Sequence, residues 1–306
     1  MKKLLSLVLV GVILLFSGCN IFNKPENKVT PPFFKISDPD TGGVVYLLGT
    51  MHVGIRNTVY PDEIYAALDE CSALAVELDL QALEADQQRL VNAMKLLECR
   101  NGETADDYIG ENYSEVKKFF QKNKIYSQSL EGYIPSVWSS LLSSKLASDC
   151  GYSSEYGTDR AMLSYAKKHS IKIIELESAE EQYQMNANEP IALQVYSLVS
   201  SVQTDHKLLT DQMKELYRAW SENDAAAIEK MLFEDEDIPE ELSEEYSQYY
   251  FMMYESRQEK MAEFIRKTLE SGEKAVVAVG AMHCFATPDI LDFLDGKMIE
   301  SVSFTN

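Results

Sequence analysis

The feature that most constrains this chain is one pattern written twice, once near each end. Residues 45–54 read VYLLGTMHVG and residues 276–285 read VVAVGAMHCF. In each copy an apolar run is followed by Gly, one further residue, Met and His. A continuous apolar run bounded by glycine is typical of a strand that is covered on both faces. We therefore expect His52 and His283 to stand just beyond two buried strands.

The residues after each copy are also alike. The first copy is followed by a Pro-Asp-led helical pattern and the strand-like SALAVELDL; the second by TPDILDFL and the strand-like KMIESVSF. A strand–helix–strand unit implies parallel strands. We predict an α/β fold whose central, mostly parallel sheet comes from an N-terminal and a C-terminal βαβ half-unit. Large helical insertions, interrupted by the strand-like IKIIELES, lie between them.

The N-terminus has the form of an export signal. Two lysines precede an apolar run over 4–16, which is shorter than the roughly 20 residues a bilayer span needs. FSGC resembles a bacterial lipobox, with Cys19 as the lipidated residue. We predict a signal peptide over 1–18, a lipidated cysteine and tether over 19–37, and one α/β domain over 38–306. The protein would be exported and anchored to the outer face of the bacterial cell membrane; a plain cleaved signal peptide is the alternative.

Charge and cysteine spacing exclude some classes of protein. The chain has 49 acidic and 28 Lys or Arg residues, a formal net charge of −21, so nucleic acid is not an expected partner. The cysteines beyond Cys19 form no CxxC pair, and we expect free thiols. Cys284 adjoins His283 and is either a thiol near a metal or an ordinary small buried residue.

The two histidines predict a metal site. In open α/β sheets, functional groups gather at the carboxyl ends of the strands. Gly49 and Gly280 would allow the tight turns that deliver His52 and His283 to that edge. Glu77, at the end of the strand-like LAVELD, would reach the same place. Two imidazoles and a carboxylate suit Mn, Co or Zn, with Glu77 as a ligand or as the general base.

Each of these residues also has a structural interpretation. A histidine at a strand end can simply cap the backbone. Glu77 in an apolar strand is costly to bury without a partner, which favours a specific role. Asp79 would share its face if the strand continued. His169 and His206 lie in polar helical stretches and are expected at the surface.

At these residues the chain resembles the TraB/GumN family, which includes the animal Tiki proteins. The family pattern is two GxxH motifs with a glutamate after the first, matched here by Gly49–His52, Gly280–His283 and Glu77. Three further segments are similar and place family residues at Gly157, Asp159, Glu177, Gln182 and Arg257. The likeness spans about residues 38–300. CFATPD after the second motif departs from the glycine- or acid-rich loop of many relatives.

The resemblance implies a metal-dependent hydrolase. Peptide cleavage is attributed to Tiki-like members, and bacterial TraB-like members are linked to shutting down peptide pheromones. A broader similarity reaches erythromycin esterase-like and haem-binding ChaN-like proteins. Arg257 would then be a catalytic oxyanion donor or a clamp for a substrate carboxylate, or else a surface charge. Asp159 would bind substrate or orient a ligand, or else cap a helix.

Three functions therefore compete. The first is an extracytoplasmic, membrane-anchored metallo-hydrolase that cleaves peptides and inactivates peptide signals. The second is a non-catalytic lipid-anchored protein that captures a peptide or haem in the same cleft. The third, a structural envelope lipoprotein, leaves the paired histidines unexplained. The sequence fixes neither the substrate, the metal nor the oligomeric state.

Overall fold

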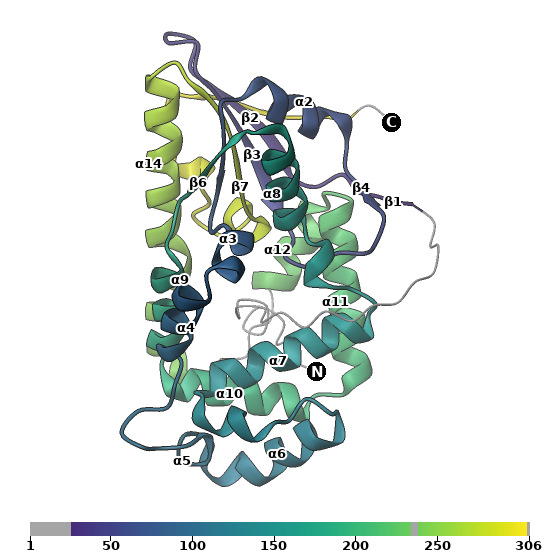
Figure 1. The fold of residues 1–306 in the computed structure, drawn as a ribbon, viewed down its shortest axis with the longest axis vertical. Coiled ribbons are helices and arrows are strands. Elements are labelled where there is room, and N and C mark those ends of the chain that lie inside the picture. Colours follow the sequence, from purple (N-terminus) through teal and green to yellow (C-terminus); the bar gives the residue numbers. More distant parts are fainter. Residues whose placement is uncertain (1–25, 234–237, 305–306) are drawn as a thin grey trace.

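A six-stranded sheet forms the centre of the molecule, in the strand order β6-β5-β7-β3-β2-β8 (Figure 1). The computed structural model describes residues 26–233 and 238–304. Strands β6, β5, β7 and β3 are parallel, whereas β2 runs antiparallel to both β3 and β8. The strands are β2 (Phe33–Ser37), β3 (Val44–Thr50), β5 (Ala73–Val76), β6 (Lys172–Glu175), β7 (Lys274–Gly280) and β8 (Met298–Ser301). The predicted mostly parallel α/β sheet is confirmed.

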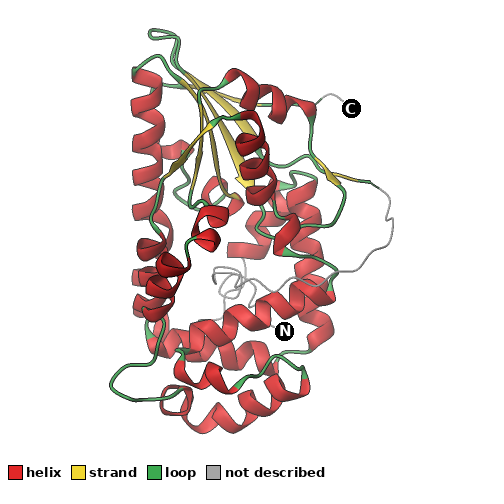
Figure 2. Cartoon of the chain, viewed as in Figure 1, coloured by secondary structure: helices red, strands yellow, loops and turns green. Residues whose placement is uncertain are grey.

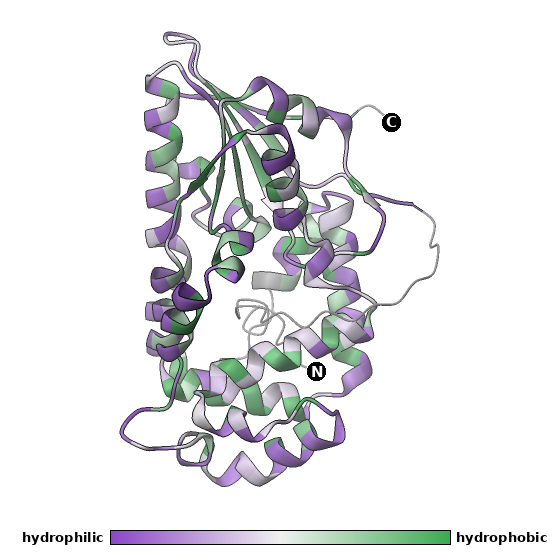
Figure 3. Ribbon diagram, viewed as in Figure 1, coloured by the Kyte–Doolittle hydropathy of each residue, from purple (hydrophilic) through white to green (hydrophobic). Residues whose placement is uncertain are grey.

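Helices cover both faces of this sheet. Helix α14 (Ser256–Glu270) lies on one side, and α2 (Asp62–Glu70) and α8 (Thr158–His169) lie on the other (Figures 1 and 2). Burial of Ile64, Ala67 and Leu68 on α2 follows the predicted helical spacing. Figure 3 shows the central strands as hydrophobic and the outer helices as mixed, which is the pattern of a sheet buried on both faces.

The remaining helices come from the long central insertions. In Figure 1, α5, α6, α7 and α10 lie beyond the carboxyl edge of the parallel strands. Their core includes Trp138, which is fully buried against Phe120 at a ring-centroid distance of 4.9 Å. The helices are α3 (Leu80–Ala85), α4 (Gln87–Lys95), α5 (Ala105–Ile109), α6 (Tyr113–Lys122), α7 (Pro135–Asp149), α9 (Ala179–Asn188), α10 (Ile191–Gln203), α11 (His206–Ser221), α12 (Ala225–Phe233) and α13 (Ser243–Tyr250), and a π-helical turn (Phe251–Glu255) joins α13 to α14.

The C-terminal half-unit differs from the expected βαβ form. Its connection holds two short turns, Ala281–Cys284 and Leu291–Phe293, in place of an α-helix, and β8 lies beside β2 instead of beside β7. Asp289 and Asp292 each accept a hydrogen bond from the other's backbone N–H, at 3.0 Å. This reciprocal pair has the form of a capping box, and it begins the second of these short turns. The two half-units still share one sheet, because β7 enters between β3 and β5.

The folded region begins earlier than predicted. Residues 33–37 were expected to belong to a tether, but they form β2 and pair with β3 and β8. Upstream, β1 (Asn27–Lys28) pairs with β4 (Thr58–Val59). The apolar letters of FFKIS supply the buried Phe33 and Ile36, so this segment is part of the core. The predicted signal peptide and Cys19 lie outside the described residues. No helix within the described ranges has the length and hydrophobicity to cross a membrane.

Candidate active site

The two GxxH motifs lie side by side because β3 and β7 are adjacent and parallel. Thr50 is in register with Gly280, so His52 and His283 leave the same edge of the sheet. Strand β5 flanks β7 on its other side and ends at Val76. Glu77 follows directly, and its Oε1 accepts a hydrogen bond of 2.6 Å from the N–H of Gly280. The two GxxH motifs and the end of β5 therefore meet at one place, as predicted.

At the two motif glycines, neighbouring groups leave little room for a side chain, and the backbone makes no unusual turn. Gly280 has φ −50° and ψ 136°, which any residue can adopt. A Cβ on Gly280 would lie 3.2 Å from Oε1 of Glu77 and 3.5 Å from Nε2 of His52. A Cβ on Gly49 would lie 3.1 Å from Pro32 and 3.3 Å from the Cα of Ala281. The predicted reason, a tight turn, is wrong, and close approach of neighbouring groups replaces it.

His52 is held by a carboxylate on α8. Its Nδ1 lies 2.9 Å from Oδ2 of Asp159, whose Oδ1 accepts a hydrogen bond of 2.7 Å from Thr50. Burial disfavours the imidazolium, but the Asp159 carboxylate outweighs it and raises the pKa of His52 to about 9. The His52 side chain is 45% exposed and that of Asp159 only 12%. Asp159 thus fixes an accessible imidazole, and its side chain does not cap α8, whose N-cap is Gly157.

Glu77 belongs to a buried network of opposite charges. Its Oε2 lies 2.8 Å from Nη2 of Arg257, which also donates to Glu177 through Nε and Nη2, each at 2.7 Å. Gln182 donates to Glu177 at 3.0 Å and to Glu77 at 3.3 Å. Burial opposes ionisation of Glu77, but the Arg257 cation outweighs it, with help from the hydrogen bond of Gly280, and lowers the pKa of Glu77 to about 2. Glu77 is therefore a carboxylate at any ordinary pH.

Arg257 donates four hydrogen bonds within this network. Its third nitrogen, Nη1, donates to the carbonyl of Met253 in the π-helical turn at 3.1 Å. The side chain is 11% exposed, so the interpretation as a surface charge is wrong. Its partners among the described residues leave Arg257 as the counter-ion of Glu77 and Glu177. The predicted oxyanion or substrate clamp would require it to exchange one of these bonds.

His283 has a different environment from His52. It is 3% exposed, and its Nε2 lies 3.8 Å from Oε1 of Glu77. Within the described part of the chain, its buried Nδ1 has no hydrogen-bond partner. Burial, followed by the nearby Arg257 cation, lowers the pKa of His283 to about 3. His283 is therefore neutral, the form that binds metals. Cys284 beside it is a buried free thiol whose pKa is raised by burial.

Several other candidates lie apart from this centre. Asp79 caps α3 through Ala82 and pairs with Lys167 at 3.0 Å, so its role is structural. His206 pairs with Asp149 at 3.1 Å and is 45% exposed, and His169 is 38% exposed. Thr50 was not singled out from the sequence, although it is the motif position at which the two copies differ in hydrogen-bonding capacity.

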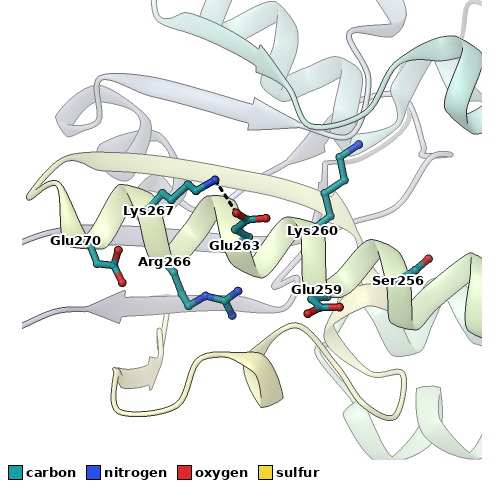
Figure 4. Close-up of a pocket in the computed structure, with 7 residues that line it drawn as sticks. All are labelled: Ser256, Glu259, Lys260, Glu263, Arg266, Lys267 and Glu270. Atoms are coloured by element: carbon teal, nitrogen blue, oxygen red, sulfur yellow. Dashed lines mark ion pairs between the residues drawn. The ribbon is translucent and has the colours of Figure 1, made fainter.

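A surface hollow runs along the outside of α14 and is not part of this centre. Figure 4 shows its lining, in which acidic and basic side chains alternate and Lys267 pairs with Glu263. Such alternation is typical of a solvated helix face. None of the residues of the sheet-edge centre lines it.

The donor groups at the sheet edge are two imidazoles and a carboxylate, and these are groups that bind divalent transition metals. The carboxylate behind His52 agrees with this, since metal-binding histidines commonly carry such an outer partner, whereas Nδ1 of His283 has none among the described residues. Within residues 26–233 and 238–304, however, no three His, Cys, Asp or Glu side chains stand at metal-ligand spacing. The residues fit such an ion chemically, and an ion there would compete with Arg257 for Glu77.

The fold and this centre together define an α/β protein with a buried charged site at the carboxyl edge of a mixed sheet. A family model described as the TraB/PrgY/gumN family matches residues 32–298. The chain belongs to this family. Searches of curated proteins and of solved structures each returned no match.

Proposed function

We propose that this protein is a hydrolase that cleaves peptides with a divalent transition metal, Mn, Co or Zn. His52 and His283 would hold the ion, and Glu77 would act as a third ligand or as the base. The observation that carries the proposal is that both GxxH motifs meet at Glu77. Its Oε1 lies 2.6 Å from the N–H nitrogen of Gly280 and 3.8 Å from Nε2 of His283, and a Cβ on Gly280 would lie 3.2 Å from that oxygen and 3.5 Å from Nε2 of His52. A bound ion would polarise the scissile carbonyl and acidify a water.

The chain's own residues support this chemistry in distinct ways. Asp159 holds His52 through Nδ1, which leaves Nε2 on the side of Gly280. Burial and Arg257 keep His283 neutral and ready to donate a lone pair. Arg257 holds Glu77 ionised and fixes its orientation, so a proton accepted there would be transient. Glu177 and Gln182 complete the support from the side of α9.

The proposal includes the site of action. With a signal peptide over 1–18 and lipidated Cys19, the protein would be exported and held on the outer face of the bacterial membrane, where peptide signals are accessible. The acidic charge of −21 is compatible with peptide substrates and unfavourable for nucleic acid. Metabolic labelling with a fatty-acid analogue tests the anchor: label should enter the wild type and not Cys19→Ala.

A peptide-library cleavage assay tests the hydrolase. Wild-type protein reconstituted with Mn, Co or Zn should turn over peptides, and Glu77→Gln should lower kcat/KM by roughly a hundredfold or more. Glu70→Gln is the matched control, because Glu70 precedes β5 at the opposite end of the sheet and pairs with Lys274 there. Absence of turnover with every metal would contradict the proposal.

A non-catalytic binding protein is the second candidate. Two observations favour it: Glu77 is already paired with Arg257, and no cluster of three ligands stands in the described residues. Such a protein would capture a peptide or haem with its histidines as ligands. Stoichiometric binding without turnover, equal in wild type and Glu77→Gln, would support it.

A further inference from the structure

Six carboxylates are buried among the described residues, and Glu189 differs from the other five. Each of the five lies within 3.0 Å of a cationic nitrogen: Asp38 with Lys297, Asp79 with Lys167, Glu131 with Lys117, Asp159 with His52 and Glu177 with Arg257. Glu189 is 8% exposed, and among the described residues no cationic nitrogen is paired with its carboxylate, whose oxygens keep some contact with solvent. A carboxylate that is mostly buried and has no cation beside it is costly to ionise.

The surroundings of Glu189 are aromatic and apolar. It ends α9, and its backbone oxygen accepts a hydrogen bond of 2.8 Å from Gln194. Beside it is a hydrophobic cluster separate from the main core, here called the tyrosine–methionine cluster: Leu193, Tyr249, Met253, Tyr254 and Ala286, with Met185 and Met282 packed against it. Glu189 lies close enough to Tyr249 for its charge to contribute to the raised pKa of that phenol.

This cluster adjoins the proposed active site. The ring of Tyr254 lies 6.1 Å from that of His283. Met253 accepts the hydrogen bond from Arg257 through its carbonyl. On α9, Gln182 contacts Glu77, and Met185 and Glu189 follow at three and seven residues, on the same helix face. At 1.5 Å per residue, Glu189 is about 10 Å along the helix from Gln182.

Among the described residues, no free positive charge stands beside the Glu189 carboxylate. An ammonium group would satisfy the carboxylate, the face of Tyr249 would add a cation–π contact, and the cluster's methionine and leucine side chains would pack an aliphatic stem. The nearby cation Arg257 does not meet this need, because Glu77 and Glu177 already neutralise it. In an extended peptide, about 10 Å corresponds to about three residues.

We propose that Glu189 and Tyr249 form a subsite for a primary ammonium group of the substrate. The ammonium is that of a lysine side chain or an amino terminus, about three residues from the scissile bond. The position relative to that bond rests on the proposed hydrolase; the binding of the ammonium does not. Burial raises the pKa of free Glu189 to about 8, so an arriving ammonium should displace a proton near neutral pH.

Calorimetry with a small probe tests the subsite without any need for turnover. We expect n-pentylammonium to bind the wild type at least tenfold more tightly than n-pentanol. Buffers of different ionisation enthalpy should report release of about one proton per site. Glu189→Gln should abolish both the preference and the proton release. Glu180→Gln, an exposed change on the same helix, should leave both intact.

Three peptides then separate the two sources of the ammonium, measured with chelator present. One carries lysine with a blocked amino terminus, one carries norleucine with a free amino terminus, and one carries norleucine with a blocked terminus. The peptide without an ammonium group is the reference. A peptide that binds the wild type more tightly than this reference, and loses that preference in Glu189→Gln, shows which ammonium the subsite takes. Equal binding of pentylammonium and pentanol, or a preference that survives in Glu189→Gln, overturns the subsite whether or not the protein cleaves peptides.

Discussion

The two GxMH motifs have nearly the same letters and opposite electrostatic surroundings. The His52 side chain is 45% exposed, bonded to Asp159, and its pKa is raised to about 9. His283 is 3% exposed, its Nδ1 has no partner among the described residues, and its pKa is lowered to about 3. Without a metal, one imidazole is thus a cation at neutral pH and the other is neutral, so an ion that binds His52 would displace its proton.

The difference comes from the segments that pack against each motif. Thr50, between Gly49 and Met51, bonds Asp159, whereas the equivalent Ala281 has no side chain to do so. Arg257 faces His283 and repels a second positive charge there. The repeated motif therefore determines the position of each histidine, and residues distant in the sequence determine its protonation state.

The largest expected effect is from Arg257→Met, which removes the cation that pairs with Glu77 and Glu177. Glu77 and Glu177 would remain buried without their counter-ion, so the free energy of unfolding should fall by about 3–5 kcal/mol. The pKa of His283 should rise toward its ordinary value, making it more like His52. Urea denaturation and NMR titration of the histidine ring protons measure the two effects.

Lys260→Met on the same helix is the control, because Lys260 is 48% exposed and its pair with Glu181 is a surface one. Its cost should stay below about 1 kcal/mol. An Arg257→Met protein as stable as this control would show that the buried network does not hold the site together.

A smaller effect is expected from alanine at the two motif glycines. Gly49→Ala presses on Pro32 and the Ala281 backbone, and overpacking of this kind costs about 1–3 kcal/mol. Gly280→Ala presses on the tips of Glu77 and His52, which can shift, so its loss of stability should be smaller and its effect on the site larger. Thermal unfolding compares the stabilities, and the NMR signals of His52 report the site. If the two variants lost the same stability and shifted the His52 signals equally, the different surroundings assigned to the two glycines would be refuted.

The smallest effect on stability is expected from Asp159→Asn, which removes the partner of His52 alone. The pKa of His52 should fall from about 9 to near or below 6.5, with His283 little changed. Because His52 is 45% exposed, the stability cost should be only about 1 kcal/mol. The extra stability of the wild type over Asp159→Asn should be complete below pH 6.5 and should vanish as the pH rises through about 9. The reason is that Asp159 stabilises only the protonated form of His52. An unchanged His52 titration would contradict the pairing.

Much of this arrangement could be predicted from the sequence, because strand-end positions follow from apolar runs and glycine spacing. His52, His283 and Glu77 were placed at one sheet edge correctly on that basis. The order of strands could not be read, since nothing local says that β7 enters between β3 and β5. Residues 33–37 read as a tether because prolines and polar residues precede a strand of only five residues. The carboxylate partners of Arg257 and His52 are 80 or more residues away in the sequence and depend on side-chain packing, which periodicity does not encode. Only the family resemblance marked Glu177 and Asp159 in advance.

The most direct test of the central claim is the metal content of the soluble domain, residues 20–306, measured by elemental analysis after reconstitution with Mn, Co and Zn. Wild type, His52→Ala and His283→Ala would be compared, with His206→Ala as a control on a surface histidine. We predict about one ion per wild-type and control chain and none in either motif variant, because both ends of the chain build one site. No stoichiometric ion under any condition, or an ion that survives loss of either motif histidine, would contradict a metal centre shared by the two motifs.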